Sequence, residues 1–168
     1  LLFSLAIVKL VAWQGGPEGV GKLGQFLSLM SIVVAFAGGG IASGVIKYVS
    51  EYRNNAHARI QLLQGAAAYT ALSAALVAGI LLVLSTQLAT WLLGDSGYRL
   101  LIVFLGLAQF MIAGHNLIIG ILSGSMDARG VAIINIVGAA IGIVAAVTLA
   151  NAYGTDGTLY SLVLGQAL

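Results

Sequence analysis

Charged residues are confined to a few short breaks along this chain, and the runs between the breaks carry none. Eleven of the twelve charged side chains lie in five breaks. The uncharged, mostly apolar runs cover residues 23–46, 60–94, 100–126 and 130–155. A membrane-spanning helix needs about 20 consecutive apolar residues, and a charge at mid-bilayer costs about 2.5–3.5 kcal/mol on insertion scales. The pattern therefore predicts a polytopic membrane protein.

The runs predict an all-α, polytopic transmembrane helical bundle with about five to six helices, because lipid offers backbone groups no partners outside the segment. We expect spans at about residues 1–14, 23–46, 62–93, 100–123 and 131–152, and a sixth that begins after residue 158. We expect the breaks between them at residues 14–22, 47–59, 95–99, 125–130 and 153–158. Since the first and last runs are short, we expect a fragment that begins and ends within spans.

Composition agrees with a membrane location. The hydrophobic fraction is 60% and the charged fraction is 7%, whereas soluble domains have about 45–50% apolar and about 25% charged residues. A net charge of +2 without a basic block argues against nucleic acid as a partner. The chain has no cysteine, which excludes disulfides and thiolate metal sites, and nothing in it implies a cofactor.

The loops predict an orientation because they differ in basic residues. The loops on one side carry four cations and those on the other carry two, namely Lys47, Arg53, Arg59 and Arg129 against Lys22 and Arg99. Loops rich in lysine and arginine remain in the cytoplasm. We therefore expect the N-terminus to lie on the cytoplasmic side.

Lys9 is the one charged residue inside an apolar run. A lysine a few residues from the end of a span can extend its ammonium group to the membrane interface. Alternatively, an intramembrane cation faces an internal cavity, which is where such charges are usually found. The residues themselves leave both interpretations open.

Small and polar residues form a stripe along the fourth span. Steps of four and three place one set of residues on a single helix face, namely Gln109, Ala113, Asn116, Gly120 and Ser123. We expect this face to contact protein or a watery cavity, because amides in hydrocarbon need partners. Three glycine pairs have GxxxG spacing: Gly40/Gly44, Gly120/Gly124 and Gly138/Gly142. Such pairs mark close packing within the bundle or a dimer face.

Two motifs imitate catalytic or nucleotide-binding sites. Residues 16–22 match the spacing GxxxxGK, but Leu23 stands where a phosphate loop needs Ser or Thr, and no strand is expected before it. His57 and His115 have neither metal-ligand spacing nor cysteine partners. Neither motif supports an enzyme.

Three segments resemble Wzx-type lipid-linked oligosaccharide flippases. They are GGPEGVGKLGQF (residues 15–26), GGGIASGVIKYVSEYRNN (38–55) and LAQFMIAGHNLIIGILSGSMDARG (107–130). The middle segment carries the most specific part, a GVxKYVxxY pattern that begins at Gly44. The family belongs to the multidrug/oligosaccharidyl-lipid/polysaccharide exporter superfamily.

The resemblance implies a fold of two six-helix lobes around a cavity that opens alternately to each side, with residues 1–168 as part of the N-terminal lobe. It implies transport of an undecaprenyl-diphosphate-linked oligosaccharide across the bacterial cytoplasmic (inner) membrane, in polysaccharide or common-antigen biosynthesis. The partners implied are this substrate, membrane lipids and the polysaccharide polymerase machinery.

The resemblance also assigns roles to polar residues. Lys9 becomes a candidate contact for a phosphate or an acidic sugar. Cations that would attract the headgroup at the cytoplasmic entrance are Lys47, Arg53 and Arg59. Side chains that would meet sugar hydroxyls are Gln25, Gln109, Asn116 and Asn135.

Other functions remain as alternatives. A cation-coupled multidrug exporter of the same superfamily usually needs an intramembrane carboxylate, whereas all five acids here lie in breaks. A membrane-embedded glycosyltransferase or ligase would have large outer loops, and those expected here are short. A structural membrane subunit is the third alternative.

Overall fold

Helices joined by short turns make up residues 2–167, which are the residues that the structure, a computed structural model, describes apart from the side chains of 2–8, 10, 11, 13–15, 38, 39, 153 and 155. The elements in chain order are α1 (Leu2–Val34), the π-helix η1 (Ala35–Gly39), α2 (Gly40–Glu51), α3 (Ala56–Val83), α4 (Ser85–Leu93), the 3₁₀ turn η2 (Ser96–Tyr98), α5 (Arg99–Gly124) and α6 (Ala128–Ala167). The predicted all-α class is confirmed.

Four segments of the described chain are long and apolar enough to cross a membrane. They are Gly16–Ala37, Ala56–Val83, Ser96–Gly124 and Ala128–Ala152. Each holds at least the roughly 20 residues needed to span the hydrocarbon core. The chain is therefore a multi-pass membrane protein, as the charge pattern predicts.

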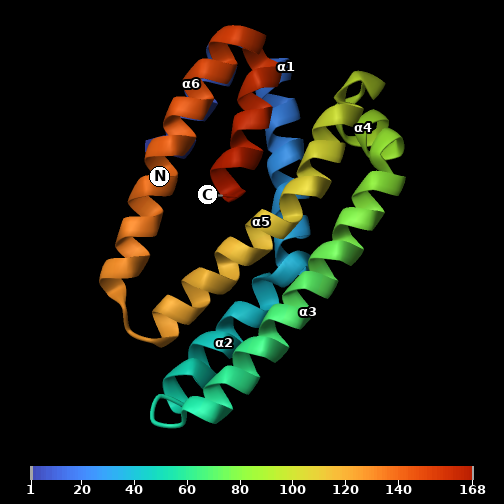
Figure 1. The fold of residues 1–168 in the computed structure, drawn as a ribbon. Coiled ribbons are helices and arrows are strands. Elements are labelled where there is room, and N and C mark those ends of the chain that lie inside the picture. Colours follow the sequence, from blue (N-terminus) through green and yellow to red (C-terminus); the bar gives the residue numbers. More distant parts are fainter. Residues whose placement is uncertain (1, 168) are drawn as a thin grey trace.

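The helices run up and down, so that their joints gather at two ends of the bundle (Figure 1). The α2–α3 loop and the α5–α6 turn lie at the lower end in that view, and α4 and the upper bend of α6 lie at the other. The sequence predicts the same grouping, with the more basic loops at one end of the bundle and the less basic loops at the other.

Two predicted breaks are much shorter than expected. The break at 14–22 narrows to Gly16, and the break at 153–158 narrows to Gly154; helix continues on both sides of each. Their φ values are 58° and 61°, with ψ near −156° and −137°. Only glycine adopts such conformations readily, so one residue is enough to turn the chain. The phosphate-loop-like motif thus lies in a bend and the helix after it.

Other boundaries also differ from the prediction. The charged break at 47–59 shrinks to residues 52–55, because α2 extends to Glu51 and Asn55 caps α3 by accepting a hydrogen bond from Ala58 N at 3.1 Å. The span at 23–46 is interrupted by η1, and the span at 62–93 is divided at Leu84. Charge marks where a span meets water, but helix continues beyond that point.

Helix α5 lies at the centre and packs against α2, α3, α4 and α6. Its upper half joins a large apolar cluster with α1, α3, α4 and the end of α6, including the fully buried Phe26, Ile102 and Leu105. Its lower half joins a smaller cluster around Val45, Val49 and Ala66. The upper and lower halves of the bundle therefore have separate cores that share two helices, α3 and α5.

The contact between α5 and α2 depends on two glycines. A Cβ atom at Gly120 would lie 3.6 Å from Ala42 O, and one at Gly124 would lie only 2.8 Å from Ile46 O. Gly120 and Gly124 therefore mark close packing within the bundle, which is the first of the two expectations for GxxxG pairs. Gly40 and Gly44 differ, because a Cβ there would meet nothing within 4 Å.

We predict that Gly124→Ala lowers the free energy of unfolding by about 1–3 kcal/mol, since the added methyl group must push α2 away. Gly40→Ala is the matched control. It adds the same atom to a helix of the same bundle in open space, and we expect stability to be kept or raised by up to about 1 kcal/mol. Thermal unfolding of the full-length protein in detergent measures both, and equal effects would contradict the role of the close contact.

Candidate functional site

The polar stripe predicted on the fourth span is turned into the bundle. On α5, Gln109, Ala113 and Gly120 are buried, and Asn116 and Ser123 are half-buried. The expectation that this face contacts protein or a cavity is confirmed. Most of it serves helix packing.

Gln109, a candidate sugar contact, is enclosed by the bundle. Its side chain is 0% exposed, and its Nε2 donates to Leu105 O on its own helix at 3.1 Å. Its Oε1 has no hydrogen-bond partner among the described residues, and neither does the buried hydroxyl of Thr70 on α3. An unpaired buried polar group costs about 1–3 kcal/mol. The amide oxygen of Gln109 can still accept a hydrogen bond, and the hydroxyl of Thr70 can still take part in one.

Asn135 lies on α6 and lines a small cavity together with His115 of α5. The cavity has a volume of about 150 Å³, and glycines make up much of its wall, namely Gly138, Gly142 and Gly165. Asn116 is the neighbour of His115 in sequence and is half-buried. These residues bring an imidazole and an amide to one place within the bundle.

The three basic residues predicted at the entrance lie close together in sequence but in different settings. Lys47 is exposed on α2, Arg53 is exposed in the α2–α3 loop, and Arg59 is half-buried in the first turns of α3. The structure thus places all of them near the lower end in Figure 1. The ammonium group of Lys47 lies 5.1 Å from the ring centre of Tyr48, within the range of a cation–π contact.

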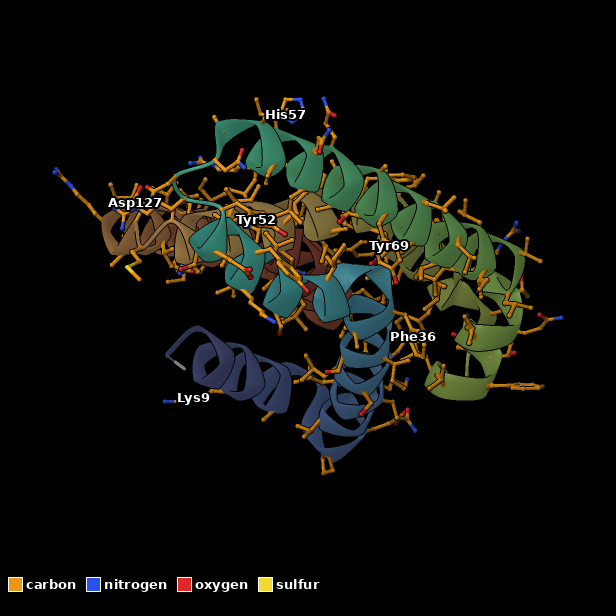
Figure 2. All side chains as sticks on the ribbon, turned by 90° about the horizontal axis from the view of Figure 1, so that it is seen from below. Lys9, Phe36, Tyr52, His57, Tyr69 and Asp127 are labelled. Carbon is orange, nitrogen blue, oxygen red and sulfur yellow. The ribbon has the colours of Figure 1, made fainter. Side chains whose placement is uncertain are left out.

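Lys9 is exposed on the N-terminal half of α1, at the edge of the protein in Figure 2. It does not lie with the basic residues of the α2–α3 end. No side chain within the described part of the chain pairs with it in a salt bridge. Both interpretations of Lys9 are compatible with this exposed position.

Gln25 belongs to an exposed face of α1 that has small and polar residues. Steps of three and four place on this face Gly21, Gly24, Ser28 and Ser31, with Gln25 beside them and Ala35 next in step at the start of η1. The hydroxyls of Ser28 and Ser31 donate to Gly24 O and Leu27 O at 2.9 and 2.8 Å. Their oxygen lone pairs remain available.

Helix α2 exposes residues of the same kind. Its exposed or half-exposed positions include Gly40, Ser43, Gly44 and Lys47. We call these residues of α1 and α2 together the polar face. The surfaces of α3 and α6 are instead aliphatic, with exposed residues such as Leu72, Leu76, Ile80, Ile136, Val137 and Val144. Aliphatic side chains suit lipid, so α3 and the first half of α6 have membrane-facing surfaces, whereas α1 and α2 expose the polar face beside a few aliphatic side chains, among them Ile32 and Ile46.

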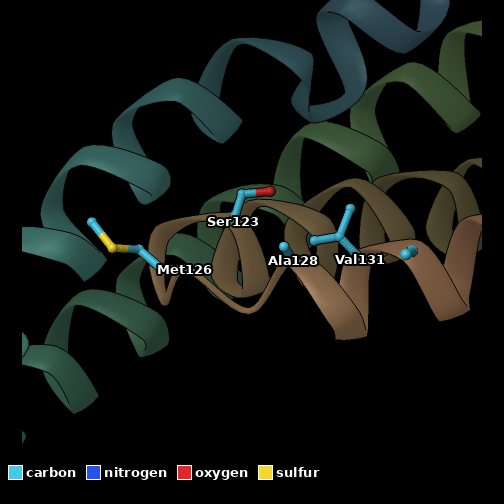
Figure 3. Close-up of a pocket in the computed structure, with 5 residues that line it drawn as sticks. Ser123, Met126, Ala128 and Val131 are labelled. Atoms are coloured by element: carbon cyan, nitrogen blue, oxygen red, sulfur yellow. The ribbon is translucent and has the colours of Figure 1, made fainter.

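A cavity of about 460 Å³ lies at the α5–α6 turn. Figure 3 shows Met126 at the tip of this turn, with Ser123 before it on α5 and Ala128 and Val131 after it on α6. Met126 has a φ of 58°, and the carboxylate of Asp127 accepts a hydrogen bond from Gly130 N at 2.9 Å. The carboxylate thus caps the N-terminus of α6 beside the cavity.

The opposite end of the bundle has its own polar group. Lys22 pairs with Glu18 at 3.0 Å and lies 5.5 Å from the ring centre of Tyr98. Nearby on α6, Asp156 and Tyr160 line a cavity of about 560 Å³ with Phe104. The Lys22–Tyr98 contact connects α1 with η2, and Asp156 lies two residues after Gly154, at which α6 bends.

Sequence reasoning missed the polar face of α1 and the pairing of Tyr48 with Tyr52. The first had a readable signal, since Gly21, Gly24, Ser28 and Ser31 show the same steps of three and four as the stripe on α5. The second had only an i, i+4 spacing, which is common by chance.

Two curated proteins match this chain. Both are named lipid III flippase, one from Escherichia coli (strain K12) and one from Shigella flexneri. Each is 32% identical over 165 residues, which is 98% of this chain. The chain spans 40% of the length of these relatives.

No known family profile matches the chain, and no solved structure does. The assignment therefore rests on the two relatives, whose name agrees with the resemblance found at residues 38–55. Over nearly its whole length, the chain is thus a sequence relative of the Wzx-type lipid-linked oligosaccharide flippases.

Proposed function

We propose that this chain is part of a flippase that moves an undecaprenyl-diphosphate-linked oligosaccharide across the bacterial inner membrane. The observation that carries this is the exposed polar face of α1 and α2, in a chain related to proteins named lipid III flippase. A diphosphate and a glycan cannot cross hydrocarbon alone. A wet path lined by small, polar and cationic residues lets the headgroup cross while the lipid tail stays in the membrane.

The polar face supplies the chemistry that such a path needs. Small residues leave room for a bulky glycan, the Gln25 amide and serine oxygens offer hydrogen bonds, and Lys47 offers a cation for phosphate. Arg53 and Arg59 extend the positive charge into the adjoining loop and helix. Their field would concentrate the anionic headgroup at this end, which we place in the cytoplasm.

The remainder of the path belongs to the rest of the protein. We propose that residues 1–168 form the N-terminal lobe, that a second lobe faces the polar face, and that rocking of the lobes provides alternating access. Asn116 and Asn135 are secondary candidates for sugar contacts, because they are partly accessible whereas Gln109 is enclosed. A polysaccharide polymerase on the outer side would take up the product.

We predict that Lys47→Gln slows transport of the lipid-linked glycan by about tenfold or more, because a charge-assisted contact with phosphate is lost. The assay is the full-length protein in liposomes, with a radiolabelled lipid-linked glycan that becomes accessible in the opposite leaflet. Wild-type protein that moves cationic drugs but not this lipid would instead indicate a multidrug exporter.

Arg129→Gln is the matched control for Lys47→Gln. Arg129 is an exposed cation at the start of α6, whose following turns have an aliphatic surface. We expect its neutralisation to leave transport within about twofold of wild type. Equal transport by the Lys47 and Arg129 variants would remove Lys47 from the path.

We predict that Lys9→Ala abolishes glycan export and that Lys9→Arg retains it, since either cation can hold a phosphate or an acidic sugar. Export is measured as surface glycan in cells that depend on the variant, divided by the amount of protein in the membrane. A lysine that only reaches the interface would change that amount and not export per molecule. Normal export by Lys9→Ala would end its role in the path.

A further inference from the structure

We propose that Tyr48 and Tyr52 form an aromatic platform for the sugar next to the diphosphate of the transported lipid. This inference rests on the proposed function and adds a specificity site to it. The two ring centroids lie 6.0 Å apart, and the ring planes differ by 21°. Together with the nearby cation of Lys47 they form one compact group at the end of α2, and we call the two rings the tyrosine pair.

One face of α2 packs against α5 and leaves the tyrosine pair partly accessible. Val45 and Val49 are 1% and 2% exposed, and Gly120 and Gly124 of α5 let them approach closely. Tyr48 is 38% exposed and Tyr52 is half-buried. The rings are therefore held in place from one side and accessible from the other.

The turns of α2 that precede the pair leave room for a ligand. Gly44 and Gly40 lie one and two turns before Tyr48, and at neither position would a Cβ atom meet any atom within 4 Å. Four-residue steps place both glycines on nearly the same helix face as the rings. A bulky polar group can thus approach the backbone directly beside the tyrosine pair.

The combination of groups fits a sugar phosphate better than a plain phosphate. The ring of an aromatic side chain offers flat apolar area, which suits the C–H face of a pyranose, and the phenol hydroxyls can bond sugar hydroxyls. The ammonium group of Lys47 is 5.1 Å from the Tyr48 ring centre. In the substrate the first sugar is bonded directly to the diphosphate, so its ring and its anion lie side by side in the same way.

The competing explanation is that these tyrosines merely anchor the protein at the membrane interface, where tyrosine is enriched. Tyr69 provides a comparison within the chain. It is 57% exposed, and it lies on α3 among aliphatic side chains (Figure 2). It has no aromatic partner or nearby cation among the described residues.

The test compares two double variants of the full-length protein with two lipids. Y48F/Y52F keeps both rings, whereas Y48L/Y52L keeps apolar area without rings. The probes are undecaprenyl diphosphate carrying one N-acetylglucosamine and undecaprenyl diphosphate without sugar. Binding of each is measured by titration in detergent, with thermal unfolding to confirm that each variant is folded and Y69L as the matched control.

We expect Y48L/Y52L to weaken binding of the sugar-bearing lipid by about three- to tenfold per ring and to leave the sugarless lipid unchanged. Y69L should bind both lipids within about twofold of wild type, and Y48F/Y52F, which loses only the hydroxyls, should weaken binding of the sugar-bearing lipid less than Y48L/Y52L does. Lys47→Gln should weaken both lipids, because it acts on the diphosphate.

Equal binding of the sugar-bearing lipid by Y48L/Y52L and wild type overturns the platform, and so does an equal loss for both lipids. A loss in Y69L as large as that in Y48L/Y52L also overturns it, in favour of interfacial anchoring. Unfolding of Y48L/Y52L would shift the comparison to the single variants Y48L and Y52L, with the same criteria. Failure of wild-type protein to bind or move either lipid would instead refute the proposed function.

Discussion

The close approach of α5 to α2 determines which surface of this protein is available to a ligand. At Gly124 the two backbones come so near that a methyl group would lie 2.8 Å from Ile46 O. Van der Waals packing of this kind is a main source of helix association in lipid, where the hydrophobic effect does not hold helices together. Because α2 gives one face to this contact, its other face is left to carry Gly44, Lys47 and Tyr48.

The bundle separates two kinds of polar group. Those on α5 are enclosed, and Gln109 has one oxygen without a partner among the described residues. Those on α1 and α2 are open, and on α1 the hydroxyls of Ser28 and Ser31 donate within their own helix. Enclosed groups restrict how helices pack, whereas open groups remain free for water or substrate. In the proposed transport path the second kind contacts the substrate, although the first is easier to notice in a sequence.

The charge pattern predicts the helical class and the grouping of loops because a charge in hydrocarbon is costly wherever it occurs. The stripe on α5 was also readable, since Gln109, Ala113 and Gly120 follow the helix period. The bends were not. Gly16 and Gly154 turn the chain with one residue each, and Leu84 divides a span without proline or glycine. These features depend on tertiary packing, as does the direction in which Lys47 points.

The π-helical turn at Ala35–Gly39 sets the rotational phase of everything that follows it. Such a turn holds one residue more than an α-turn, so it advances the helix surface by about 100° relative to an uninterrupted α-helix. With a regular α-turn in its place, the face of α2 that bears Val45 and Val49 would rotate away from α5, against which it packs. The direction in which Lys47 points from the helix axis is thus determined before α2 begins. The segment that determines it, Ala35–Gly39, contains no charged residue and no proposed substrate contact.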